Sequence, residues 1–132
     1  MNKLVHEELT SRIIACAIEV HKALGPGFLE SIYEPALVIE LQRAGLRVEQ
    51  QKIIPVTYRE MPVGEHRLDL LVEGKIVVEL KTISAVEDIH FAIVRSYLKA
   101  AGLEHGLLLN FATIPLTVKR VIRQNSSPAV FS

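Results

Sequence analysis

Residues 66–82 read HRLDLLVEGKIVVELKT, and the rest of the chain can be organised around them. Two short apolar runs lie on either side of Glu73-Gly74-Lys75. Apolar runs of this length between turn residues favour a buried β-hairpin over a helix. Because side chains alternate across a strand, Glu79 and Lys81 share one face, and Asp69 lies on the neighbouring strand within pairing distance.

These three charged side chains stand among leucine and valine, where unpaired charge is costly. In one explanation, Lys81 neutralises Glu79 and Asp69 caps the hairpin or meets Arg67. In the other, the two carboxylates hold a divalent metal, because Mg²⁺ prefers oxygen ligands. Lys81 would then orient a metal-activated water or stabilise developing negative charge. Spacing alone leaves both explanations open and slightly favours the ion pair.

The composition indicates one domain spanning residues 1–132. The chain has 132 residues and is 49% hydrophobic, which suits a single core with frayed ends at 1–8 and 124–132. No apolar run approaches the roughly 20 residues that cross a bilayer, so we expect no membrane partner. A single cysteine excludes an internal disulfide, and the expected setting is the reducing cytoplasm. The net charge of zero counts against a large basic nucleic-acid surface.

Hydrophobic periodicity predicts alternating helical and extended segments. The expected elements are helices over 9–24 and 29–44, a strand over 46–58, a turn over 59–65, the hairpin over 66–82, a helix over 86–101, a strand over 105–111, and a last strand or short helix over 116–122. Pro35 is unfavourable inside the second helix, which could instead restart there after a separate turn over 28–34. This order predicts an α/β sandwich with a mixed sheet.

Several segments, taken in order, resemble the GxxExxY protein family. Residues 27–33, Gly-Phe-Leu-Glu-Ser-Ile-Tyr, have the signature spacing. The other matching segments are AIEVH at 17–21, LGPG at 24–27, RLDLLV at 67–72, VELK at 78–81, SYLK at 96–99 and GLLLNF at 106–111. The resemblance extends from about residue 9 to residue 122, and the family is placed in the PD-(D/E)XK nuclease-like superfamily.

This resemblance implies an αβββαβ core, with a mixed sheet flanked by helices, and hydrolysis of nucleic-acid phosphodiester bonds with Mg²⁺ or Mn²⁺. Asp69 matches the first acidic position of the superfamily, and Glu79 and Lys81 match the second motif. Glu30 matches the helical glutamate that often completes the metal site. The main-chain carbonyl of Leu80 is a further expected metal ligand.

Other side chains are candidates for contacts with the nucleic acid. His66 and Arg67 precede the first acidic residue, and Tyr33 and Tyr97 are expected in the core or the wall of the site. A packing or surface role is the simpler explanation for each of them singly. The densest basic cluster supplies further candidate phosphate contacts: Lys119, Arg120 and Arg123.

Two positions depart from the family pattern. Ile93 stands where the family usually has a glutamine, and Pro35 stands where a helix former is expected. The alternative hypothesis is therefore a catalytically inactive nuclease-like module that binds a partner, a second copy of itself in a homodimer, or nucleic acid. A subunit that cleaves only with a partner is a third hypothesis. Metal binding separates the enzyme from the interaction module.

Overall fold

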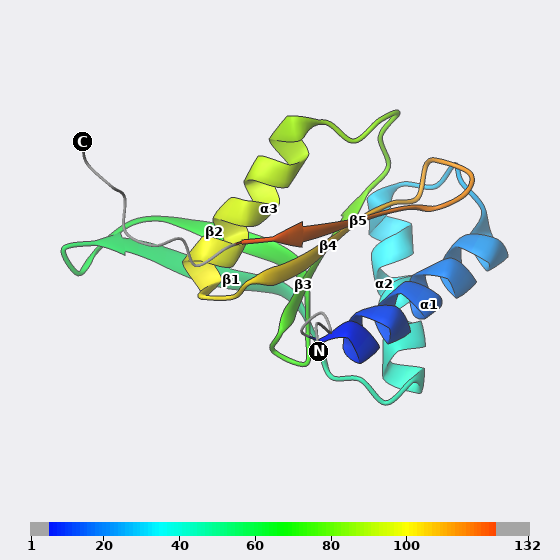
Figure 1. The fold of residues 1–132 in the computed structure, drawn as a ribbon, viewed down its shortest axis with the longest axis horizontal. Coiled ribbons are helices and arrows are strands. Elements are labelled where there is room, and N and C mark those ends of the chain that lie inside the picture. Colours follow the sequence, from blue (N-terminus) through cyan, green and yellow to red (C-terminus); the bar gives the residue numbers. More distant parts are fainter. Residues whose placement is uncertain (1–5, 124–132) are drawn as a thin grey trace, which may run out of the picture.

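The computed structural model describes residues 6–123, which form three helices and five strands (Figure 1). In chain order they are α1 (Glu7–Leu24), α2 (Glu30–Arg43), β1 (Val48–Tyr58), β2 (Met61–Val72), β3 (Ile76–Lys81), α3 (Asp88–Ala101), β4 (His105–Asn110) and β5 (Thr117–Ile122). The predicted order of elements is confirmed, and the last element is a strand.

One sheet contains all five strands in the order β1-β2-β3-β4-β5. β3 and β4 are parallel and are connected through α3, whereas every other neighbouring pair is antiparallel. Antiparallel neighbours are joined by short turns, but a parallel pair needs a longer crossover, which α3 provides. The sheet is therefore mixed, as predicted.

Helices cover both faces of this sheet. They bury the side chains of β3, which is apolar on both sides. Val78 and Leu80 pack in the core beneath α1 and α2, whereas Val77 packs in the core beneath α3. A strand buried on both faces reads as a continuous apolar run instead of an alternating one. The architecture is an α/β fold with helices flanking a mixed sheet, as the fold prediction stated.

β1 and β2 extend past the end of β3 as a two-stranded arm of the sheet, formed by residues 52–58 and 61–68 (Figure 1). β2 pairs with β3 only from Leu70 to Val72, so the rest of β2 has β1 as its only strand neighbour within the described residues. The predicted turn over 59–65 is wrong. The chain reverses at Arg59 and Glu60, and Met61, Pro62, Gly64 and Glu65 already pair with β1. Pro62 and Gly64 are tolerated because the arm is open to solvent.

Two predictions about the helices also need correction. α1 begins at Glu7, so the fraying expected over residues 1–8 does not extend to Glu7 and Glu8. Residues 1–5 and 124–132, the rest of the expected frayed ends, lie outside the described residues. α2 runs unbroken from Glu30 through Pro35, so the helix does not restart at the proline. The ring of Pro35 is exposed, and buried side chains on the opposite face outweigh one missing hydrogen bond.

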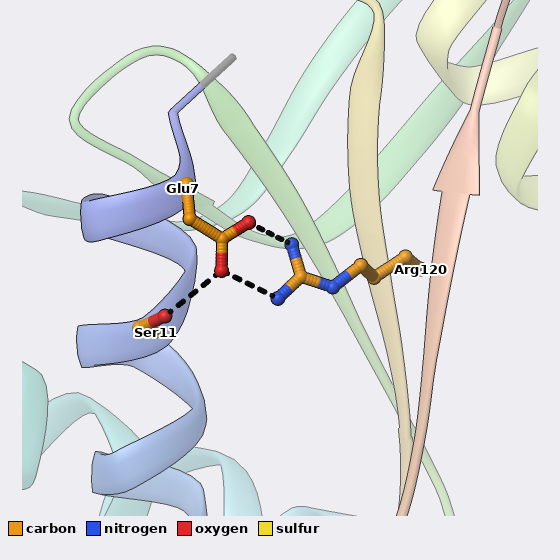
Figure 2. A network of polar contacts seen from close by, with 3 residues as sticks. All are labelled: Glu7, Ser11 and Arg120. Atoms are coloured by element: carbon orange, nitrogen blue, oxygen red, sulfur yellow. Dashed lines mark hydrogen bonds and ion pairs between the residues drawn. The ribbon is translucent and has the colours of Figure 1, made fainter. Parts of the chain in front are cut away.

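Arg120 on β5 links the start of α1 to the sheet (Figure 2). Its guanidinium donates to both carboxylate oxygens of Glu7 at 3.1 and 3.3 Å, and the Ser11 hydroxyl donates to the same carboxylate at 3.3 Å. This candidate phosphate contact therefore already has a carboxylate partner within its own chain.

We expect Arg120→Ala to lower the free energy of unfolding by only about 0.5–1 kcal/mol, because both partners are partly exposed. Urea unfolding should show that most of this difference disappears at about 1 M salt, where exposed charges are screened. A loss above about 2 kcal/mol, or one that does not depend on salt, would contradict a surface ion pair.

Candidate active site

Asp69 lies where β2 and β3 separate. The last paired residues of the two strands are Leu70 and Val78. Beyond them, Oδ2 of Asp69 accepts a hydrogen bond from the backbone N–H of Leu80 at 3.0 Å. Asp69 thus bridges the gap between the strands with its side chain, which keeps a carboxylate between their diverging backbones.

The regular alternation of β2 is interrupted at the same place. Leu68 and Leu71 both pack beneath α3, although residues three positions apart in a regular strand face opposite sides. On the facing strand Gln51 has a positive φ of 53°. Both irregularities fall at Asp69, since Gln51 lies opposite it, between the pair of Gln50 with Leu70 and the pair of Lys52 with Leu68. The Asp69 side chain reaches β3 at this point.

Glu79 is a buried carboxylate with an unsatisfied oxygen. It is 5% exposed, and its Oε1 has no hydrogen-bond partner among the described residues. Burial, followed by the nearby charge of Asp69, raises the pKa of Glu79 to about 8. Burial also raises the pKa of Asp69, while the N–H of Leu80 acts in the opposite direction. The charge of Asp69 therefore disfavours a charge on Glu79, while the charges of Glu34 and Glu30 add to the raised pKa of Asp69.

Lys81 supplies a balancing positive charge. It acts to lower the pKa of both Asp69 and Glu79. Yet the ion pairs formed within residues 6–123 join Arg47 to Glu73, Lys52 to Glu49 and Arg120 to Glu7. The direct ion pairs considered for Lys81 with Glu79 and for Asp69 with Arg67 are therefore wrong in this part of the chain. The capping role considered for Asp69 agrees with its hydrogen bond to Leu80.

Glu30 brings α2 to the end of β3. It is the first residue of the helix, and its Oε2 accepts a hydrogen bond from the backbone N–H of Thr82 at 3.2 Å. Its charge contributes to raising the pKa of both Asp69 and Glu79, after the larger effect of burial. Over residues 6–123, however, no group of three or more His, Cys, Asp or Glu side chains is arranged to hold a metal ion. Glu30 lies beside the carboxylate pair and is engaged with the backbone.

Asn110 fixes the chain that follows Lys81, a role that the sequence pattern did not predict. It is fully buried at the end of β4, opposite Lys81. Its side-chain amide donates to the carbonyl of Ile83 at 2.8 Å and accepts from the N–H groups of Ile83 and Ala112 at 3.1 and 3.2 Å. A polar residue that ends an apolar strand was the available signal. Its partners could not be read from the sequence because they lie in two different loops.

The candidate substrate contacts have different surroundings. The ring of Tyr97, on α3, lies 4.8 Å from the ring of His66. Burial, then the charges of Glu79 and Asp69, raise the pKa of Tyr97. Arg67 is exposed on the arm.

Tyr33, in contrast, belongs to the core. It is fully buried and its ring stacks on Phe111 at 4.6 Å. Its hydroxyl donates to the carbonyl of Gly25 and accepts from the N–H of Phe28. This burial excludes the substrate contact predicted for Tyr33 and leaves its other expected role, a core residue that holds the loop before α2.

A family model described as "PD-(D/E)XK nuclease superfamily" matches residues 7–123, from the start of α1 to just beyond β5. The chain belongs to the PD-(D/E)XK nuclease superfamily. None of the curated proteins matches it. A solved structure described as "Crystal structure of SSO0001" has the same fold, with a TM-score of 0.57 and 16% sequence identity. The match covers 92% of this chain and 61% of that one, so this PD-(D/E)XK chain spans about three-fifths of that protein.

PD-(D/E)XK nucleases generally use divalent metal ions, and the residues present here suit such an ion. A hard cation takes carboxylate oxygens and keeps several waters, so one or two protein carboxylates are enough for Mg²⁺. The unpartnered Oε1 of Glu79, next to Asp69, is an oxygen that a cation would satisfy. Within residues 6–123 no helix is long and apolar enough to span a membrane.

Proposed function

We propose that this protein is a Mg²⁺-dependent nuclease of the GxxExxY type, which hydrolyses phosphodiester bonds of nucleic acids in the cytoplasm. One observation carries the proposal. Two buried carboxylates, Asp69 and Glu79, lie together with an unsatisfied oxygen, and Lys81 lies beside them without an ion pair in the described chain. Membership of the superfamily supports the same chemistry.

Each residue has a separate role in this proposal. Asp69 and Glu79 would hold Mg²⁺ or Mn²⁺, with the carbonyl of Leu80 as a further ligand, and Glu30 would bind the ion through a coordinated water. The bound ion would lower the pKa of a coordinated water and polarise the phosphate. Lys81 would position that water by hydrogen bonding and stabilise the negative charge that develops on the phosphate. The low dielectric around the buried carboxylates strengthens the effect of the lysine charge.

Calorimetric titration with Mn²⁺ tests the metal site. We expect the wild type to bind the ion, and the Asp69→Ala, Glu79→Ala double variant to lose binding because both proposed carboxylate ligands from the hairpin are gone. The Glu8→Ala, Glu19→Ala double variant is a matched control, since it removes two exposed carboxylates from α1. Circular dichroism should first show that all three proteins are folded. A wild type that does not bind Mn²⁺ would overturn the proposal.

An inactive interaction module is the second candidate, and the arm favours it. Tyr58, Met61 and Val63 are 63–65% exposed near its tip, and exposed apolar side chains gathered in one place often mark protein contacts. Ile93 lies on α3 one turn before Tyr97, where the family usually has a polar side chain. In this case the chain would form a homodimer in light scattering, and neither Mn²⁺ binding nor cleavage would be observed.

A further inference from the structure

A groove of about 460 Å³ lies between the arm and α3. Pro55–Thr57 and His66 line it from the arm, and Ser96, Lys99 and Ala100 line it from the helix. The groove exists because β2 leaves β3 before it reaches the arm, so α3 faces a two-stranded ribbon there (Figure 1). Its volume lies in the usual range for small-ligand sites, about 300–1,000 Å³, and is large enough for one nucleotide.

This groove continues from the candidate active site. His66 lines the groove, and its ring contacts the ring of Tyr97. Tyr97 in turn packs against the buried cluster that contains Leu68, next to Asp69 in the chain. The charges of Glu79 and Asp69 act on the hydroxyl of Tyr97. The carboxylates, Tyr97, His66 and the groove therefore follow one another, and a chain-like ligand at the carboxylates could extend into the groove.

The lining of the groove suits a nucleotide. Lys99 is an exposed cation that can pair with a phosphate, and none of the residues that line the groove is acidic. The Nε2 of His66 is hydrogen-bonded to Oγ of Ser96 at 2.9 Å, which fixes the orientation of the imidazole. Unpaired bases stack on planar rings, and phosphates bind to cations. Pro55, Val56 and Ala100 add apolar surface for the faces of a base or sugar.

We propose that this groove binds the nucleotide that flanks the scissile phosphate, with its base unpaired, so that the substrate is single-stranded at this point. The inference rests on the proposed nuclease function. Both faces of a base within a duplex are covered by neighbouring bases, so a base enters a groove of this size only after it has left the stack. His66 contacts the base or sugar, and Lys99 pairs with the adjoining phosphate.

Binding of a fluorescent oligonucleotide, measured by anisotropy without divalent metal, tests this assignment. We expect tighter binding of a single strand than of a blunt duplex with the same sequence. His66→Ala and Lys99→Ala should each weaken single-strand binding by about tenfold, as expected for the loss of one stacking or phosphate contact. Lys99→Ala should also reduce the slope of log affinity against log salt by about 1. Lys22→Ala, an exposed lysine on α1, is the matched control and should bind like the wild type.

Equal affinity for duplex and single strand, or affinities in both variants within about twofold of the wild type, would overturn the groove assignment. Thermal unfolding should confirm that each variant is folded. Because binding is measured without metal, the two proposals can fail separately. Binding through His66 and Lys99 without any cleavage in Mg²⁺ would keep the groove as a single-strand binding site and reject the nuclease. Cleavage of single strands and duplexes alike, with an unchanged KM in both variants, would keep the nuclease and reject the groove.

Discussion

Lys81→Ala is expected to lower Mg²⁺-dependent cleavage of a labelled oligonucleotide by about 100- to 1,000-fold, while the fold is retained. The lysine charge acts on both Asp69 and Glu79, the proposed metal-holding residues, so it can also act on a water and a phosphate bound there. No ion pair within the described residues involves Lys81, so its removal breaks no salt bridge there. The initial rate of cleavage, compared with that of the wild type at equal metal concentration, measures the effect.

Lys75→Ala provides the matched control, because Lys75 is an exposed lysine in the turn of the same hairpin. We expect it to cleave at the wild-type rate. Circular dichroism should show that both variants are folded, and all cleavage should stop when a chelator removes the metal. Wild-type rates in Lys81→Ala, or an equal loss in Lys75→Ala, would show that Lys81 has no special part in the reaction.

Glu79→Gln is expected to stabilise the metal-free protein at high pH while it abolishes metal binding. The pKa of Glu79 is raised from 4.5 to about 8, so between these values the folded state holds a proton that the unfolded state has released. The resulting stability is fully present below pH 4.5 and is lost as the pH rises through 8. Each pKa unit corresponds to about 1.4 kcal/mol, so the variant should gain on the order of 2–4 kcal/mol over the wild type at about pH 9.

Urea unfolding at about pH 5 and pH 9, with a chelator present, measures this difference. The gain of Glu79→Gln over the wild type should be larger at the higher pH. When Mn²⁺ replaces the chelator, it should stabilise the wild type, because a ligand that binds only the folded state stabilises that state. The stability of the variant should not change. Glu65→Gln, on the exposed arm, should follow the wild type throughout. The same pH dependence in Glu79→Gln and the wild type would show that Glu79 is not the titrating group.

Local patterns in the sequence were sufficient to predict the hairpin and the positions of its charged side chains. The turn at 73–75 and the apolar run of β3 follow from residues adjacent in the chain, and the structure has both. The same local reasoning failed on the arm, where Pro62 and Gly64 suggested a turn. These residues pair with β1 because the arm is a two-stranded, solvent-exposed part of the sheet, where a proline or glycine costs little.

The amino-acid sequence by itself determined the order of the elements, the mixed sheet, and the presence of Asp69, Glu79 and Lys81 on adjoining strands. Only the tertiary structure decided that Glu79 has an unsatisfied buried oxygen and that Tyr33 is enclosed in the core. It also decided that Glu30 binds the backbone of Thr82, 52 residues away, and that a groove lies between the arm and α3. The physical reason is that hydrophobic periodicity depends on near neighbours in the chain. Burial, desolvation and the partners of polar atoms depend instead on segments that folding brings together.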